Sequence, residues 1–168
     1  MFSSGSSHTA ISTKTLATEL TIVEDWDLSI DLKLPAQSTA LWKNVFGIQV
    51  EGTEKELPGS RIPSVWIRKD QVDVMLRVDY VTVDFYHVAT KFNTGNWINL
   101  KISQTGGICS IKVDSQLVHQ EINSSPKIWT NVKIVMGNVY GRDGLLPADG
   151  EYRNFEINNF PLTSKSLQ

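Results

Sequence analysis

The segment Gly137–Gly150 holds the side chains whose types and spacing best suit ligand binding. Its four glycines indicate a loop. The candidate binding residues in it are Asn138, Tyr140, Arg142, Asp143 and Asp149. A tyrosine ring stacks on a sugar or anchors a protein contact, and a guanidinium holds a carboxylate. Ca²⁺ takes oxygen ligands, so Asp143 and Asp149 are the candidate calcium ligands. Because Asp-Gly pairs are also common in turns, a solvated loop without a ligand is the alternative interpretation.

Two residues outside this loop complete the candidate ligand-binding set, and they are Arg77 and Trp97. Arg77 belongs to a basic group in which aspartates are interspersed, so a mixed solvated face is favoured over a polyanion site. That group is Arg61, Arg68, Lys69 and Arg77. Trp97 and Trp129 are out of phase with the apolar residues of their own segments, which predicts that both face the second surface of a sheet. If neighbouring strands bring the two rings together, they form an aromatic platform.

The elements that position these residues are predicted to be β-strands, because apolar and polar residues alternate along most of the chain. The clearest strand begins at Trp26 and ends at Pro35, which cannot donate to a ladder. Further strands are predicted at Val45–Val50, Pro63–Arg68, Val72–Val78, Val81–Val88, Trp97–Ser103, Cys109–Val113, Gln116–Ile122, Ile128–Met136 and Arg153–Asn158. Only Thr13–Leu20 is compatible with a turn of helix.

Short connectors rich in Gly and Asn lie between these segments, among them Gln104–Gly107 and Asp114-Ser115, and they imply antiparallel pairing. Strands with one apolar face each are buried best as two stacked sheets. The predicted fold class is therefore all-β, an antiparallel two-sheet β-sandwich of the jelly-roll kind. The expected organisation is a flexible N-terminal segment over residues 1–18, a β-sandwich domain over 19–160 and a C-terminal tail over 161–168.

Composition excludes several classes of protein. Hydrophobic residues make up 40% of the 168 residues, and 16 basic against 18 acidic residues give a net charge of −2. A disordered chain has fewer apolar residues, and a nucleic-acid binder is normally basic. No apolar run approaches the ~20 residues that cross a bilayer. The single cysteine, Cys109, alternates with Ile111 and Val113, which predicts a buried strand residue rather than a nucleophile.

The order of segments from Phe85 onward carries a family resemblance. Trp97 opens a strand, Val113-Asp114-Ser115 lies at a hairpin, and the Gly-rich stretch IVMGNVYGRDG precedes the closing strand DGEYRNFEI. This order resembles the concanavalin A-like lectin/glucanase superfamily, in particular its laminin-G-like and pentraxin-like jelly rolls. The resemblance spans Leu20 to Phe160, with Ser115 in place of the usual glycine. It implies a β-sandwich that binds a glycan or a protein, with calcium in some relatives.

The same resemblance includes retaining glucanases, whose catalytic strand carries Glu-x-Asp-x-x-Glu, and this motif is missing from the sequence. Asp27 and Asp31 lie opposite the apolar residues of their strand, as solvated charges do. The three histidines form no zinc motif, and no G-x-S-x-G elbow is present. We therefore expect no enzyme activity and no catalytic residues. A glycan-active enzyme whose acid and base come from separate strands is the alternative.

The sequence thus predicts a non-catalytic recognition module that binds a glycan or an extracellular protein in adhesion or cell-surface recognition. A structural or assembly domain that associates through a sheet face or edge is a third hypothesis. The predicted location is extracellular or at the cell surface, which the sequon Asn123-Ser124-Ser125 favours, although a single cysteine also suits a reducing compartment. Calcium is the only cofactor expected, self-association is included among the partners, and nucleic acid and membrane insertion are not.

Overall fold

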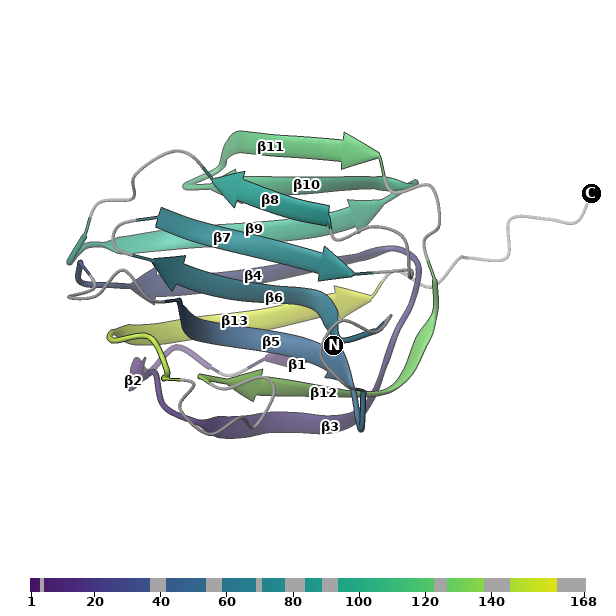
Figure 1. Cartoon of the computed structure of the whole chain (residues 1–168), viewed down its shortest axis with the longest axis horizontal. Coiled ribbons are helices and arrows are strands. Elements are labelled where there is room, and N and C mark those ends of the chain that lie inside the picture. Colours follow the sequence, from purple (N-terminus) through teal and green to yellow (C-terminus); the bar gives the residue numbers. More distant parts are fainter. Residues whose placement is uncertain are drawn as a thin grey trace, which may run out of the picture.

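The computed structural model describes residues 1–3, 5–36, 42–53, 59–68, 71–77, 84–88, 94–122, 127–137 and 146–159. For 71–77 and 84–88 only the backbone path is described. These residues form thirteen β-strands and no helix, and the strands are arranged in two layers (Figure 1). The described residues accordingly contain no helix that is long and apolar enough to cross a bilayer.

The first layer, sheet A, has the strand order β1-β13-β4-β9-β10-β11, and β2 also pairs with β13. Its strands are β1 (Phe2–Ser3), β2 (Thr9–Ala10), β4 (Trp26–Lys33), β9 (Trp97–Thr105), β10 (Ile108–Val113), β11 (Gln116–Ile122) and β13 (Glu151–Asn159). Every pairing in the sheet is antiparallel. The run β9-β10-β11 is a meander of consecutive strands, as the short connectors predicted.

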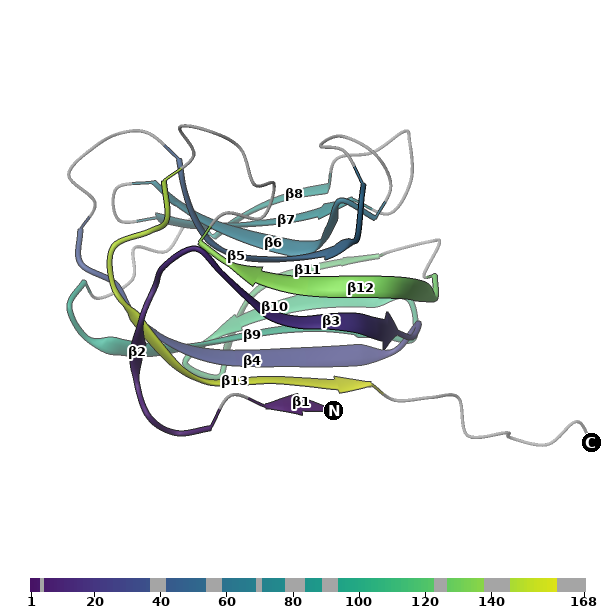
Figure 2. The same cartoon turned by 90° about the horizontal axis from the view of Figure 1, so that it is seen from below.

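The second layer, sheet B, has the order β3-β12-β5-β6-β7-β8 and is also antiparallel. Its strands are β3 (Lys14–Ile22), β5 (Lys43–Val50), β6 (Arg61–Arg68), β7 (Gln71–Arg77), β8 (Asp84–Val88) and β12 (Trp129–Met136). Figure 2 shows the two layers from the side, with β5 to β8 on one side and β4, β9 and β13 on the other. The predicted two-sheet sandwich is confirmed, and the predicted strands correspond to β4 through β13.

The core lies between the two sheets and consists of the apolar residues that occupy alternate positions in the predicted strands. Strand β4 alternates buried and half-buried positions along its whole length. Phe46 of sheet B and Phe155 of sheet A are both fully buried, and their ring centroids lie 5.1 Å apart. Trp26 and Cys109 are buried as predicted, with 4% and 1% of their surfaces exposed. Burial of this apolar surface is the main stabilising contribution to the fold.

The N-terminal residues belong to the sandwich, which corrects two expectations. Thr13–Leu20 does not form a turn of helix, because β3 (Lys14–Ile22) pairs with β12 along this stretch. Phe2 in β1 is paired with Ile157, so strands are present within the predicted flexible segment 1–18. The sandwich therefore begins before the expected boundary at residue 19.

The irregular geometry of β3 explains why its sequence does not alternate. The ladder between β3 and β12 shifts register at three places, and Glu19 has a positive φ of 56°. Each shift changes which residues face the core, so apolar and polar positions lose their two-residue period. Such a strand cannot be identified from periodicity alone.

Gly150 connects the loop before β13 to the sheet, and only glycine fits there. Its φ is +132°, and a Cβ atom would lie 2.5 Å from the backbone oxygen of Lys33 and 2.9 Å from Leu34 Cδ2. We predict that Gly150→Ala lowers the free energy of unfolding by about 2–3 kcal/mol, measured by urea denaturation. Gly95→Ala is the control, since Gly95 also has a positive φ but has no atom within 4 Å of the added Cβ. Equal losses in the two variants would contradict the steric explanation.

Candidate functional site

Most of the predicted loop site lies outside the described residues, namely Asn138, Tyr140, Arg142 and Asp143, as does the sequon at Asn123. Asp149 is described, and its Oδ2 accepts a hydrogen bond from Lys43 Nζ at 2.8 Å. Within the described part of the chain, no three His, Cys, Asp or Glu side chains come together as metal ligands. The described residues therefore supply no calcium site by themselves, and calcium at Asp143 and Asp149 stays a prediction.

Arg77 and Trp97 are separated by the fold, because Arg77 lies on β7 of sheet B and Trp97 on β9 of sheet A. Of the basic group around Arg77, Arg61, its cross-strand neighbour, is only 6% exposed and so is not part of an open surface. The aromatic platform of Trp97 with Trp129 is wrong for the same topological reason: Trp129 lies on β12, in the other sheet. Sequence periodicity assigns a face to a residue but does not say which strands are neighbours.

A different set of residues surrounds Trp97 on the outer face of sheet A. Trp97 alternates with the buried Ile98 and Leu100, so its half-buried ring lies on the outer surface, as predicted. Directly across the strands, Lys33 faces Trp97, and Asp31 faces both Asn99 and Arg153. We call this set the Trp97 platform. Its members are His8, Asp31, Lys33, Trp97, Asn99, Glu151, Arg153 and Asn154.

A β-bulge in β13 positions two members of the platform. The register between β13 and β4 shifts between Arg153 and Glu156, and Asn154 has a positive φ of 51°, which asparagine tolerates better than most residues. The extra residue allows Arg153 to face outward while Phe155 enters the core. It also lets the Asn154 side chain reach Asp31 on β4, where its Nδ2 donates to Oδ2 at 2.7 Å.

Arg153 is held in one orientation by two contacts. Its Nε donates to Asp31 Oδ2 at 3.3 Å, and its guanidinium carbon lies 4.2 Å from the centroid of the Trp97 ring. A guanidinium stacked on an indole gains cation–π attraction and retains its in-plane N–H groups for other acceptors. The side chain is 36% exposed, so these groups are accessible from solvent.

Asp31 is the acceptor that connects the platform. Asn99 Nδ2 donates to its Oδ1 at 2.9 Å, and Asn154 and Arg153 donate to Oδ2. Partial burial raises the pKa of Asp31, but these hydrogen bonds and the Arg153 charge outweigh that effect and hold the pKa below its ordinary value. Asp31 is therefore a carboxylate at neutral pH and is unsuited to act as a general acid.

The edge of the platform is formed by His8, just before β2. Its Nδ1 lies 3.2 Å from Glu151 Oε1, and its ring meets the Trp97 ring edge-on with centroids 6.2 Å apart. Four separate segments thus meet around one indole: the residue before β2, and the strands β4, β9 and β13. Because three of these are central strands of a sheet, the platform is on a rigid support.

Sequence reasoning found Trp97 but missed its partners. The sequence pattern predicts a solvated outer-face charge at Asp31 and places Arg153 only as the first residue of the strand Arg153–Asn158. The available signal was the spacing of core residues in β13, where Tyr152, Phe155 and Ile157 are three and then two positions apart. That break in a two-residue period predicts a bulge.

Several polar side chains of β5 and β6 in sheet B are buried. Asn44 and Ser64 are fully buried there, and Trp66 donates from Nε1 to Ser64 Oγ at 2.9 Å. Asn44 Nδ2 donates to the Val65 backbone oxygen at 3.2 Å. Gln49 Oε1 is buried without a hydrogen-bond partner among the described residues. These side chains pack and pair with each other, whereas the Trp97 platform is open to solvent.

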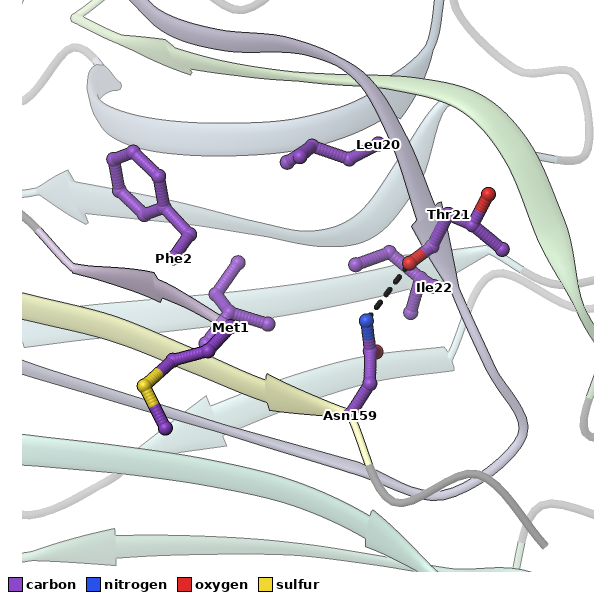
Figure 3. Close-up of a pocket in the computed structure, with 7 residues that line it drawn as sticks. Met1, Phe2, Leu20, Thr21, Ile22 and Asn159 are labelled. Atoms are coloured by element: carbon purple, nitrogen blue, oxygen red, sulfur yellow. Dashed lines mark hydrogen bonds between the residues drawn. The ribbon is translucent and has the colours of Figure 1, made fainter.

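A small pocket lies elsewhere, between the N-terminal strand and the ends of β3 and β13 (Figure 3). Its lining includes Phe2, Leu20 and Ile22, and Asn159 closes it by donating from Nδ2 to the Thr21 backbone oxygen at 2.8 Å. The cavity volume is ≈ 30 Å³, against about 300 Å³ or more for ordinary ligand sites. This pocket is too small to hold a sugar ring.

Family models and curated proteins gave no match to the sequence, but solved structures gave several. A native heptameric SAP-like pentraxin from Limulus polyphemus has 12% identity and a TM-score of 0.61, with 89% of this chain and 68% of that chain covered. An endo-β-1,4-glucuronan lyase from the fungus Trichoderma reesei has 13% identity and a TM-score of 0.60, covering 92% and 76%. The receptor binding domain of botulinum neurotoxin D has 10% identity and a TM-score of 0.58, covering 89% and 37%.

Identities this low establish the fold alone. The alignments include nearly the whole chain, yet the chain spans little more than a third of the toxin structure. These neighbours comprise a pentraxin, a receptor-binding domain and a glycan-active enzyme, so the architecture serves both binding and catalysis. The chain therefore has the concanavalin A-like jelly-roll fold, a β-sandwich that it shares with the pentraxin, the lyase and the toxin domain.

Proposed function

We propose that this domain is a non-catalytic recognition module that binds a glycan through the Trp97 platform, in adhesion or recognition at the cell surface. The observation that carries the proposal is a half-buried tryptophan on the outer face of sheet A, with the guanidinium carbon of Arg153 4.2 Å from its ring centroid. The fold neighbours support it, since a pentraxin and a toxin receptor-binding domain are among them.

The chemistry of the platform suits a sugar. An indole offers an apolar surface to the C–H groups of a pyranose ring, and neighbouring amides bond its hydroxyls. Asn99 and Asn154 each donate from Nδ2 to Asp31, which leaves their side-chain carbonyl oxygens as acceptors. Within the described residues neither oxygen has a recorded donor. A sugar hydroxyl is a donor that fits such acceptors.

The absence of catalysis is inferred from the state of the acidic groups. Asp31 accepts three hydrogen bonds, and Asp27 accepts one from Asn158 Nδ2 at 3.0 Å and lies 3.3 Å from Lys101 Nζ. Retaining glycoside hydrolysis requires one carboxyl with a raised pKa and a second as nucleophile. The lowered pKa of Asp31 does not suit the acid of such a pair.

Glycan-array binding of the wild-type domain and of Trp97→Ala tests the proposal. We expect the substitution to weaken binding about tenfold or more, because both the stacking surface and the support of Arg153 are removed. Trp129→Ala is the matched control: Trp129 is also half-buried with a cation, Lys127 Nζ, 5.8 Å from its ring centroid, but it belongs to sheet B. Full binding by Trp97→Ala, or an equal loss in Trp129→Ala, would place the site elsewhere.

The same assay examines the predictions that stay open. Loss of binding in EDTA would support calcium at Asp143 and Asp149, and unchanged binding would contradict it. Sedimentation of the unliganded domain at increasing concentration tests self-association.

A glycan-active enzyme is the second candidate, and sheet B provides its motivation. The backbone register places Asp73 of β7 opposite His87 of β8, and opposite Trp66 of β6 on the other side. A carboxylate and an imidazole at paired positions are a possible acid–base set, and one fold neighbour is a glucuronan lyase. Release of shorter or unsaturated products from any bound glycan would favour this candidate over the recognition module.

A further inference from the structure

Arg153 keeps more hydrogen-bonding capacity than its contacts use. Its Nε is bonded to Asp31, and one face of the guanidinium is stacked on Trp97. Among the described residues, neither terminal Nη group has a recorded acceptor. The guanidinium therefore presents its unused N–H groups in a fixed plane, and this geometry matches the two oxygens of a carboxylate.

Asp31 orients Arg153 without consuming those groups. Its two oxygens are satisfied mainly by neutral donors, with Asn99 Nδ2 at 2.9 Å on Oδ1 and Asn154 Nδ2 at 2.7 Å on Oδ2. The bond from Arg153 is the longest of the three, at 3.3 Å. A second carboxylate can therefore approach the free side of the guanidinium while Asp31 stays bonded.

The charged side chains around Arg153 balance formally, with Arg153 and Lys33 against Asp31 and Glu151. Lys33 lies two residues from Asp31 on the same face of β4 and directly opposite Glu151 on β13, and within the described residues its ammonium donates no hydrogen bond. Glu151, the nearest remaining acid on the platform, is engaged with His8 at 3.2 Å. Two cations, Arg153 and Lys33, thus face solvent beside one indole.

We propose that the Trp97 platform recognises an acidic sugar, a hexuronate whose carboxylate is bound by the Nη groups of Arg153 while its ring contacts Trp97. This inference rests on the proposed glycan binding and adds the class of sugar. Each polar group of the platform has a partner on a hexuronate. The guanidinium of Arg153 binds the carboxylate, and the carbonyl oxygens of Asn99 and Asn154 accept hydrogen bonds from sugar hydroxyls. One carboxylate per site is consistent with a domain of net charge −2, which does not attract polyanions at long range.

A sugar suits the platform better than an acidic peptide does. The site lies on the outer face of β4, β9 and β13, which are paired on both sides, so these strands offer no free edge for main-chain pairing with a peptide. Short polar groups beside an aromatic ring on a flat surface instead complement a ring that carries hydroxyls.

Isothermal titration calorimetry provides the test, with tetrasaccharides of galacturonate, glucuronate and mannuronate and the same compounds after reduction of their carboxyls to alcohols. We expect at least one acidic tetrasaccharide to bind about 10- to 100-fold more tightly than its reduced form, as loss of a charged hydrogen-bonded pair implies. Arg153→Lys should remove most of that difference, because an ammonium cannot form the paired contact. Lys112→Gln removes a positive charge elsewhere on the outer face of sheet A and should leave the difference intact.

The outcomes separate the two proposals. If reduced and acidic sugars bind equally, and both depend on Trp97, the recognition module stands and the inference about the carboxylate is overturned. If no sugar binds, both are overturned. A tetraglutamate peptide that binds as tightly as the best sugar and requires Arg153 would assign the site to a protein partner. Thermal unfolding of Arg153→Lys near the wild-type temperature establishes that a change in binding is not a loss of fold.

Discussion

Replacement of Phe155 by alanine lowers the free energy of unfolding by about 3–5 kcal/mol, the range for a fully buried aromatic side chain. Phe155 is 0% exposed, and its ring lies between those of Phe46, at 5.1 Å, and Phe2, at 5.7 Å. Phe46 belongs to sheet B and Phe2 to the edge of sheet A, so the ring joins the two layers. Its removal leaves a cavity that β-strands cannot close without breaking their ladders.

Chemical denaturation measures this loss, and Phe155→Leu is the control. Leucine keeps most of the buried volume, so we expect that variant to lose much less stability than alanine does. A loss below about 1 kcal/mol for Phe155→Ala would mean that the ring is not packed as described. The two variants together separate the effect of the cavity from the loss of aromatic contacts.

Substitution of Asp31 by asparagine is expected to lower the free energy of unfolding by about 2–3 kcal/mol at pH 7. The new amide places a donor among three other donors, those of Asn99, Asn154 and Arg153. Arg153 also loses the acceptor that fixes it, so binding at the Trp97 platform should fall with stability. Asp25→Asn is the control, since Asp25 is half-buried and accepts one bond, from the Gly106 backbone N–H.

The pH dependence of this difference follows from the depressed pKa of Asp31. Its pKa is lowered in the folded state, so the charged form stabilises the fold at pH values above the unfolded pKa, about 3.9. That contribution is lost as pH falls through the folded pKa. The stability difference between wild type and Asp31→Asn should therefore be constant from pH 5 to 7 and shrink below about pH 4. A difference that shrinks near neutral pH would contradict the assignment.

The strands could be predicted from the sequence wherever one face of the strand is exposed to solvent and the other is buried. β4 and β9 alternate strictly because each position faces either the core or solvent, and the hairpin after β10 was recognised from Asp114-Ser115, whose φ values are 49° and 68°. β3 was missed because its register shifts remove that alternation.

The candidate site was predictable only in part, because contacts across strands depend on topology. The prediction that Trp97 faces the outer surface of its sheet is correct, but the residue that contacts its ring is Arg153 and not Trp129. The order β13-β4-β9 brings Arg153 within stacking distance of Trp97, although the two residues are 56 positions apart in the chain. Single-sequence periodicity contains no information about strand order, so it predicts a solvated charge at Asp31 and does not single out Arg153.

The bulge in β13 gives this surface a signature that can be found in other sequences. An uninterrupted final strand spaces its buried residues by two, whereas here the string Tyr152-Arg153-Asn154-Phe155 inserts two outward residues between buried aromatics. At identities of 10–13% the fold is shared without recognisable sequence similarity, whereas this short string indicates the bulge directly. We expect β-sandwiches that carry this four-residue pattern in the strand equivalent to β13, and an aspartate on the neighbouring strand, to share this surface even where their overall sequences differ.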